Sequence, residues 1–365
     1  MLEARSIAII GASVREGSLG WHVLDELRHG GFDGRIYPVN PRYDEVDGLP
    51  CFPSVADIPQ AVDLAVLAVA NSRQEEQARA AADAGAKSLV IFASLYDEGD
   101  RRTRTKDRVT AIAREAGLAM CGGNCMGFLN VERRVWATGF STADLRPGGI
   151  SLISHSGSAF VAFAFNRRGL RFNLLASPGQ ELTTTLADYF AYAVEQESTR
   201  AVGMLVEQIR DLDAFEAAAE VATARDIPVV ALKIGRTERA KPLVTAHSGA
   251  DAGDDDHYQA LFDGLGILRV RTMQEMADTL ELLVAGRRAP KGGLAAVHDS
   301  GGERALLVDL AADRKVPRPR LGRDEEPDGR RARSGSGPGE SAGRVGVGHR
   351  AGGHLHRVHA RAARR

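Results

Sequence analysis

Short apolar runs alternate with longer, alanine-rich stretches of helical periodicity along most of this chain. The first apolar runs cover residues 6–10, 34–39, 64–69, 88–92 and 118–120. Helical stretches at 73–84 and 101–116 lie between them, and a glycine follows each one, Gly85 or Gly117, as is common at helix ends. Strands and helices in this order predict βαβ units around a parallel sheet. We therefore expect residues 1–140 to form one doubly wound α/β domain.

The alternation breaks at residues 141–149 and then restarts. Pro147-Gly148-Gly149 suits a linker. The later apolar runs cover residues 150–154, 174–177, 201–205, 228–232 and 267–270, and the clearest helices cover 212–224 and 272–283. This pattern predicts a second α/β domain over residues 146–288. A third α/β unit begins at about residue 291 but is incomplete, because its pattern of one strand, a glycine turn and one helix stops at residue 315.

The composition changes abruptly at about Val316. Residues after Lys315 contain no Lys, Ile, Phe, Tyr, Trp, Met or Cys and are rich in Arg, Gly and Ala. Such a segment buries too little apolar surface to offset its ordering entropy, so residues 316–365 are expected to be disordered. One interpretation is a basic tail that binds nucleic acid. We favour an out-of-frame reading of a GC-rich gene, because the change falls inside an unfinished α/β unit.

Composition and charge limit the class of partner. The formal net charge is −1, which predicts no global nucleic-acid or membrane surface and favours a small polar or anionic ligand. Three cysteines are too few for a disulfide framework, and Cys121 and Cys125 have no further Cys or His nearby to complete a metal site. No run approaches the ~20 apolar residues of a membrane helix. We expect a soluble, cytoplasmic protein without a bound metal.

A glycine-rich turn after the first predicted strand is the first candidate site. Gly11 and Ser13 end this strand, and Gly17 and Ser18 precede a helix. A strand, a tight glycine turn and a helix N-terminus together form a cradle for phosphate, because backbone N–H groups point at the anion. The spacing differs from the G-x-G-x-x-G dinucleotide fingerprint.

The tip of the second predicted strand narrows the choice of nucleotide. A NAD site would have an acidic residue there to bind the ribose hydroxyls, whereas this chain has Arg42. An arginine attracts a ribose phosphate, which both coenzyme A and NADP carry. An ordinary turn with a solvated arginine is the remaining alternative.

These segments resemble a known family. Gly11-Ala12-Ser13, the run from Gly31 to Arg42 and Val62-Asp63-Leu64-Ala65-Val66 are similar to the CoA-binding domain of acyl-CoA synthetases that form a nucleoside diphosphate. This family is related to the α subunit of succinyl-CoA synthetase, and the resemblance extends to about residue 315. It implies a Rossmann-like CoA-binding domain followed by a flavodoxin-like, succinyl-CoA-synthetase-type domain. It also implies that the glycine-rich turn holds the CoA phosphates and that Arg42 holds the nucleotide end.

Asn124 is a further candidate in the first domain. The segment Gly122-Gly123-Asn124-Cys125-Met126-Gly127 resembles the family's Gly-Pro-Asn-Cys-Leu-Gly loop. The resemblance implies that the Asn124 amide binds the acyl or thiol end of CoA. A plain turn residue is the alternative.

The second domain contains two candidate histidines in similar surroundings, Ser154-His155-Ser156-Gly157 and Ala246-His247-Ser248-Gly249. Spacing alone does not rank them, although a mobile loop suits a phosphoryl carrier. The second segment resembles the family's Ser-His-Thr-Gly loop, whose histidine is phosphorylated, so His247 is the implied nucleophile and is expected on a loop. The first resembles a Ser-Gln-Ser-Gly segment that opens a helix, which implies that Ser156 and Gly157 bind the phosphoryl group at that helix N-terminus.

A carboxylate that holds the other ring nitrogen would fix the tautomer of such a nucleophile. Glu207 ends a predicted strand and resembles the glutamate of the family's Leu-Glu-Gly-Ile-Arg segment. A solvated glutamate is the alternative. Two weaker features are the turn at residues 177–181 and an acidic cluster at residues 251–256, which either binds a metal or begins a helix.

The resemblance implies that the chain is the CoA-binding, phosphohistidine half of an acid–CoA ligase. The complete reaction joins a carboxylic acid to CoA through an acyl phosphate, with ATP and Mg²⁺ handled by an ATP-grasp module that the sequence does not show. We expect an ATP-grasp β subunit as partner, and an oligomer. The alternatives are a non-catalytic CoA-binding regulatory module and an NADP-dependent oxidoreductase.

Overall fold

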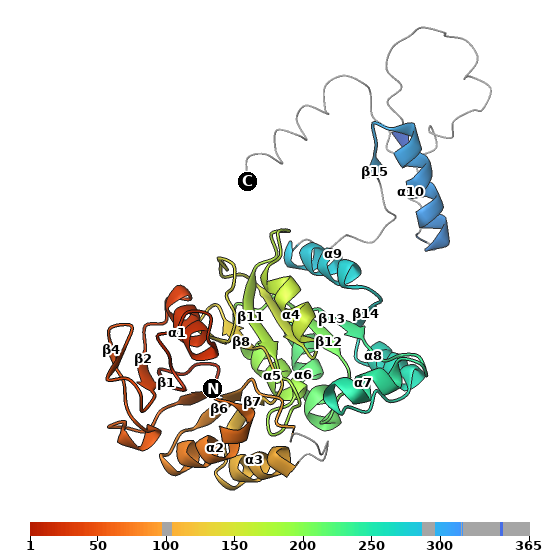
Figure 1. Ribbon diagram of the computed structural model, residues 1–365. Coiled ribbons are helices and arrows are strands. Elements are labelled where there is room, and N and C mark those ends of the chain that lie inside the picture. The colour runs from red at the N-terminus through yellow and green to blue at the C-terminus, as the bar shows by residue number, and fades with distance from the viewer. Residues whose placement is uncertain (97–103, 287–295, 315, 317–343, 346–365) are drawn as a thin grey trace, which may run out of the picture. The chain divides into compact units, whose positions relative to one another are not determined.

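The computed structural model describes residues 1–96, 104–286, 296–314, 316 and 344–345 (Figure 1). It divides into two compact units, Met1–Arg287 and Arg288–Arg365. No helix in the described ranges is long and apolar enough to cross a membrane.

The first sheet has five parallel strands in the order β2-β1-β5-β6-β7. These strands are β1 Ser6–Ile10, β2 Arg35–Val39, β5 Leu64–Leu67, β6 Ser88–Ile91 and β7 Ala119–Gly122. Its helices are α1 Leu19–His29, α2 Gln74–Asp83 and α3 Arg104–Glu115. Side chains alternate between the faces of a strand, so Ile7 and Ile9 of β1 pack with α1, while Ala8 and Ile10 pack with α2 and α3. Burial on both faces explains why these strands are continuously apolar.

Shorter elements decorate this sheet. They are the hairpin β3 Glu45–Val46 and β4 Leu49–Pro50, and the 3₁₀ turns η1 Val55–Asp57 and η2 Asn71–Arg73.

The second sheet has seven strands in the order β14-β13-β12-β10-β11-β8-β9. Its parallel strands are β10 Ile150–Ser154, β11 Phe172–Ser177, β12 Ala201–Val206, β13 Val229–Lys233 and β14 Leu268–Val270. Helices α5 Leu186–Glu195 and α6 Leu212–Ala224 pack on one face, and α4 Gly157–Ala164 and α9 Met273–Val284 pack on the other. Helices α7 Lys241–Ser248 and α8 Asp255–Gly264 lie between β13 and β14 in the chain (Figure 1).

The remaining two strands of this sheet were not anticipated. β8 Gly127–Asn130 and β9 Val135–Thr138 form a hairpin, and β8 pairs antiparallel with β11. Residues 127–138 were assigned to the first domain, yet their backbone hydrogen bonds belong to the second sheet. The hairpin covers the edge of β11, so the chain crosses to the second sheet before the linker at residues 141–149.

The second unit is small in its described part. β15 Ala296–Val297 pairs antiparallel with β16 Arg344–Val345. Helix α10 Gly301–Asp313 has Ser300 as its N-cap, so the two glycines expected to form a turn lie in its first turn instead. Residues 317–343 and 346–365, which carry most of the predicted disordered tail, lie outside the described residues.

A buried carboxylate attaches the linker to the first domain. Glu26 on α1 is 1% exposed and accepts hydrogen bonds from both the backbone N–H and the hydroxyl of Thr142. His29, one turn later, contacts Asp144 with 2.9 Å between Nε2 and Oδ1, and this hydrogen bond raises the pKa of His29. The linker segment therefore has a fixed path along α1.

Glu26→Ala is expected to lower the free energy of unfolding by about 1–3 kcal/mol, because the Thr142 donors would be left buried and unpaired. Chemical denaturation measures this change. Asp25→Ala, at an exposed position on the same helix, is the matched control and should change stability by less than about 0.5 kcal/mol. Equal effects of the two substitutions would contradict the role of Glu26.

Candidate active site

The glycine-rich turn after β1 is tightly folded. Gly11 has φ +96°, and a Cβ added to Gly20 in the first turn of α1 would lie 2.0 Å from the Gly11 carbonyl oxygen. No side chain fits at this approach. Gly17 also has a positive φ, +75°, but a Cβ there would meet nothing within 4 Å. The turn thus combines a packed base with an open position at Gly17, as a phosphate cradle needs.

The hydroxyl groups of the two serines in this turn differ in whether they can still donate a hydrogen bond to a ligand. Ser18 is the N-cap of α1, where its hydroxyl donates to Arg15 O at 2.7 Å and accepts from the Trp21 N–H at 3.4 Å. Ser13 Oγ accepts from the Arg15 N–H at 3.0 Å, which leaves its own proton to donate. The Ser18 hydroxyl is therefore used within the turn, whereas the Ser13 hydroxyl still has a proton to donate to a phosphate oxygen.

Asn40 connects this turn to Arg42. Its amide nitrogen donates to Ala12 O at 2.7 Å, and its amide oxygen accepts from the Arg42 N–H at 3.0 Å. β1 and β2 are parallel neighbours, so both segments lie at the carboxyl edge of the sheet, where ligands bind in open α/β sheets. The Arg42 side chain is exposed, and no ion pair involving it is found within the described ranges. The structure therefore brings Ser13, Gly17 and Arg42 together on one edge.

The Asn124 loop contacts the turn after β11. Gln180 N–H donates to Gly123 O at 2.9 Å, and Gly122 N–H donates to Pro178 O at 3.1 Å. Asn124 adopts φ +53°, and its side chain is exposed beside these contacts. The two predicted segments, 122–127 and 177–181, thus meet where the first sheet joins the second.

His247 and Glu207 form the central pair of the second domain. His247 Nδ1 lies 3.1 Å from Glu207 Oε1. The glutamate side chain is 5% exposed, whereas the histidine side chain is 53% exposed. A carboxylate at Nδ1 favours the tautomer with its proton on Nδ1, which leaves Nε2 as the nucleophilic atom. The geometry expected for this pair is therefore present.

The prediction that His247 lies on a loop was wrong. His247 lies in the last turn of α7, which has Pro242 in its first turn and ends at Gly249 with φ +70°. Pro at a helix start and Gly just past its end are the sequence signals that would have revealed this short helix. The following segment is fixed as well, because Asp251 N–H donates to the Gln208 side chain at 3.1 Å.

Helix α4 begins as predicted. Ser156 is its N-cap and accepts from the Ala159 N–H at 3.3 Å. A Cβ on Gly157 would lie 2.9 Å from Met126 Cγ, so a glycine allows the Asn124 loop to approach the helix start.

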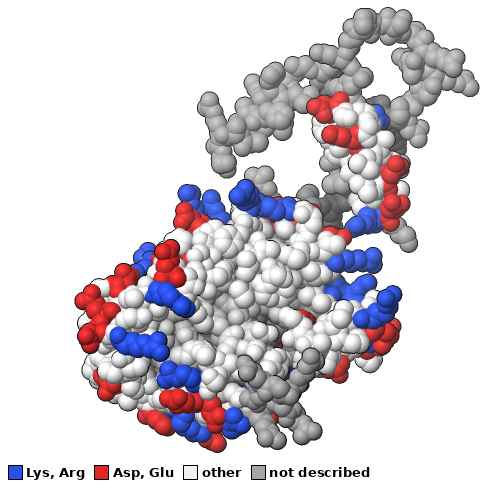
Figure 2. All heavy atoms as spheres, in the orientation of Figure 1, with Lys and Arg blue, Asp and Glu red and all other residues white. Residues whose placement is uncertain are grey.

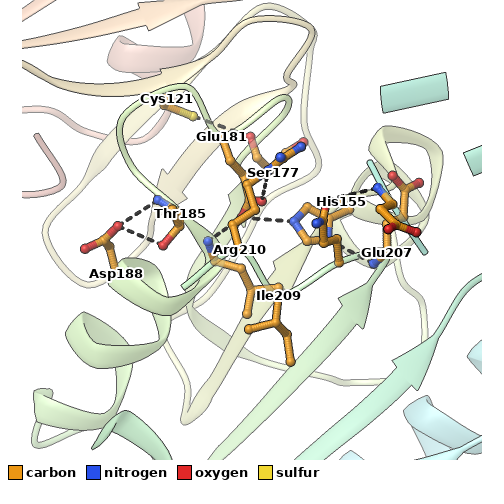
Figure 3. Close-up of polar contacts among 12 residues, drawn as sticks. Cys121, His155, Ser177, Glu181, Thr185, Asp188, Glu207, Ile209 and Arg210 are labelled. Atoms are coloured by element: carbon orange, nitrogen blue, oxygen red, sulfur yellow. Dashed lines mark hydrogen bonds and ion pairs between the residues drawn. The ribbon is translucent and has the colours of Figure 1, made fainter. Parts of the chain in front are cut away.

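His155 is buried, with a hydrogen bond at Nδ1, while Nε2 has a carboxylate oxygen close by but no hydrogen bond of good geometry (Figure 3). Nδ1 accepts from the Glu207 N–H at 3.0 Å, and Nε2 lies 3.1 Å from Glu181 Oε1. The other oxygen of Glu181 accepts from Arg210 Nε at 3.0 Å. Of the two candidate histidines, His155 is therefore enclosed and His247 is the exposed one.

The acidic cluster is a helix start. Asp254 is the N-cap of α8, and the N–H groups of Asp256 and His257 lower its pKa. Asp255 forms an ion pair with Arg269. No set of three metal-binding side chains occurs among the residues that the structure describes.

Sequence reasoning missed Lys233, a 3% exposed residue at the end of β13. Its ammonium group donates to the Glu207 carbonyl oxygen at 2.8 Å. Burial lowers the pKa of Lys233 to about 8. A lysine ending an otherwise apolar strand was the available signal.

Each half of the chain matches a known protein family. The CoA binding domain family matches residues 5–130, and the succinyl-CoA ligase like flavodoxin domain family matches residues 147–283. The chain is 34% identical over 320 residues to Trans-feruloyl-CoA synthase of an unknown prokaryotic organism, covering 86% of this chain and 45% of that protein. It is 29% identical over 314 residues to the Acetate–CoA ligase (ADP-forming) II subunit alpha of Pyrococcus furiosus, covering 85% of this chain and 67% of that subunit.

A solved structure shows the same arrangement. Acetyl-coenzyme A synthetase 1 of Ca. Korarchaeum cryptofilum, in complex with phosphate and ADP, superposes with a TM-score of 0.78 at 27% identity, covering 87% of this chain and 69% of that chain. The present chain spans about half the length of the curated relatives it matches.

The chain therefore consists of a CoA-binding domain followed by a succinyl-CoA-ligase-like flavodoxin domain. Its relatives are named as ADP-forming acid–CoA ligases, one of them as an alpha subunit, in agreement with the family predicted from the sequence. The two domain matches confirm the predicted fold class.

Proposed function

We propose that this chain is the CoA-binding and phosphohistidine-carrying half of an ADP-forming acid–CoA ligase, with His247 as the phosphorylated residue. The observation that supports this proposal best is the contact between His247 Nδ1 and the buried Glu207 carboxylate. The two family matches, one for each domain, agree with it.

The pair suits phosphoryl transfer for a simple electrostatic reason. When Nε2 of His247 attacks the γ-phosphorus of ATP and ADP leaves, the imidazole ring becomes cationic, and the buried Glu207 carboxylate stabilises that charge. The phosphoryl group then passes to a carboxylate oxygen of the acid, which frees Nε2 and gives an acyl phosphate. The CoA thiolate attacks its carbonyl carbon and releases phosphate.

The reverse direction tests this proposal without a nucleotide. Acyl-CoA and ³²P-labelled phosphate should give acyl phosphate and CoA, and the acyl phosphate should then label the chain and release the acid. The label should survive alkali and be lost in acid, as a phosphoramidate does. A panel of aromatic and short aliphatic acyl-CoA compounds is appropriate, because the relatives' names include both feruloyl and acetate substrates. Binding of CoA without any label would favour a non-catalytic CoA-binding module.

The CoA site is proposed to use Gly11, Ser13, Gly17 and Ser18 around the phosphates, with Arg42 at the ribose phosphate. Asn124 is proposed to bind the thiol or acyl end.

Arg42 provides a direct test of this site. CoA should bind more tightly than dephospho-CoA by about 1.5–3 kcal/mol, the value of one charge-assisted contact. Isothermal titration calorimetry measures the difference, and Arg42→Ala should remove it. Arg35→Ala, at the opposite end of β2, should retain it. Equal binding of CoA and dephospho-CoA to the unmodified chain would exclude Arg42 from the site, and preference for NADP over CoA would favour the oxidoreductase alternative.

An ATP-grasp β subunit is the proposed partner, because the P. furiosus relative is named as an alpha subunit. Such a subunit would carry ATP and Mg²⁺ to His247. On the face of the first unit drawn in Figure 2, acidic and basic side chains are interspersed. This face shows no field of a single sign that would favour nucleic acid.

A further inference from the structure

The main chain of Glu207 is held from two sides by buried, ionisable side chains. His155 Nδ1 accepts from its N–H at 3.0 Å, and Lys233 Nζ donates to its carbonyl oxygen at 2.8 Å. His155 and Lys233 are 7% and 3% exposed. Figure 3 shows His155 directed at Glu207.

The main chain of Glu207 needs these two contacts because the backbone hydrogen bonding between β12 and β13 ends at Val206, one residue before Glu207. The last parallel pair of β12 and β13 is Val206 with Lys233, so Glu207 lies just beyond the ladder. A buried backbone group outside the ladder must find another partner. His155 and Lys233 supply these partners on opposite sides of the residue whose carboxylate contacts His247.

Lys233 is itself rigidly held. Its ammonium also donates to Ile234 O and lies 4.5 Å from the centroid of the Tyr258 ring. The Tyr258 hydroxyl in turn accepts from the Ile209 N–H at 3.1 Å. Residues 207–209 are therefore fixed by side chains from β13 and α8.

His155 is fixed in one tautomer. Because Nδ1 accepts from the Glu207 N–H, the ring proton lies on Nε2, which faces Glu181 Oε1 at 3.1 Å. Glu181 is held in turn by Arg210 and by the Leu186 N–H. The ring therefore has little freedom to rotate.

A purely structural role explains Lys233 poorly. Burial of a charged amine costs free energy, and a neutral hydrogen-bond donor of similar size could serve the Glu207 carbonyl oxygen without that cost. A charged donor on the main chain of the residue that contacts His247 is more easily explained by function than by stability.

We infer that Lys233 and His155 are positioning residues, which fix the main chain of Glu207 and thereby aim its carboxylate at Nδ1 of His247 during phosphoryl transfer. This inference rests on the proposed function. It requires a rigid orientation of Glu207, because misplacement by about 1 Å can cost roughly 100-fold in rate.

The test measures the single-turnover rate of labelling by acyl-CoA and phosphate, and the acyl-CoA concentration for half-maximal rate. Lys233→Met and His155→Leu should lower the rate by roughly 10- to 100-fold and leave the half-maximal concentration unchanged. His155→Gln should restore most of the rate, because its amide oxygen can accept from the Glu207 N–H. Lys233→Arg should retain more activity than Lys233→Met because it keeps the donors.

Two pH measurements separate positioning from simple stabilisation. The pKa of Lys233 is lowered from 10.5 to about 8, so its charged form destabilises the fold, and stability should rise with pH between about 8 and 10.5. Lys233→Met should remove that rise, and it should label more slowly than the unmodified chain at a pH where both are folded. The unmodified rate should fall above pH about 8 as the ammonium is lost, and Lys233→Arg should not show this fall. The charged groups facing Lys233 are Glu207, Lys241, Asp255 and Arg269.

The results that would overturn this inference differ from the result that would contradict the proposed function. Unmodified rates in both Lys233→Met and His155→Leu would overturn the inference, as would equal losses in His155→Gln and His155→Leu. Absence of label from the unmodified chain would instead contradict the proposed function itself.

Discussion

His247→Ala is expected to abolish labelling of the chain by acyl-CoA and phosphate. The side chain is half exposed at the end of α7, with Nδ1 on Glu207 and Nε2 left to attack phosphorus. Alanine removes the side-chain nitrogen that the proposed mechanism uses to accept the phosphoryl group, so the loss should exceed 1,000-fold, roughly the scale seen when a nucleophile is deleted. Phosphate incorporation after acid and alkali treatment measures the result.

CoA binding should be unchanged in this variant, because the proposed CoA cradle lies at the edge of the first sheet. His257→Ala is the matched control, since His257 is exposed on neighbouring α8. It should label normally. Persistence of the label in His247→Ala, with its loss in His155→Ala, would reverse the assignment of the two histidines.

Glu207→Gln is expected to slow labelling by about 100-fold or more, the range found when a catalytic histidine loses its orienting carboxylate. Glutamine preserves the volume at this 4% exposed position. It can still accept a hydrogen bond from Nδ1–H, but it carries no charge to stabilise the cationic ring. The single-turnover labelling rate measures this effect.

The loss should appear in the rate and leave the affinity for CoA unchanged. Glu238→Gln provides the control, because Glu238 is an exposed carboxylate that pairs with Lys241 at the start of α7. A Glu207→Gln rate within about threefold of the unmodified rate would show that the carboxylate does not support the histidine.

The sequence by itself determined the fold class and the family. The parallel strands of both sheets coincide closely with the apolar runs, because central strands of a parallel sheet are covered on both faces and are therefore mostly apolar. The helix starts at Ser18 and Ser156 were also predictable, since a capping hydroxyl followed by an apolar stretch is a local signal.

The sequence also selected the residues of the candidate pair, but only through resemblance to a family. Spacing could not rank His155 against His247. The structure separates them by burial, with one ring enclosed between Glu207 and Glu181 and the other half exposed. Their chemical roles remain predictions for the labelling experiments.

Only the tertiary structure decided two features. It placed the hairpin β8–β9 in the second sheet and revealed Lys233 beneath Glu207. Residues 207 and 233 are 26 positions apart in the chain. Periodicity reports only which face of an element is apolar, whereas the pairing of two strands and the burial of a charge depend on contacts between distant segments.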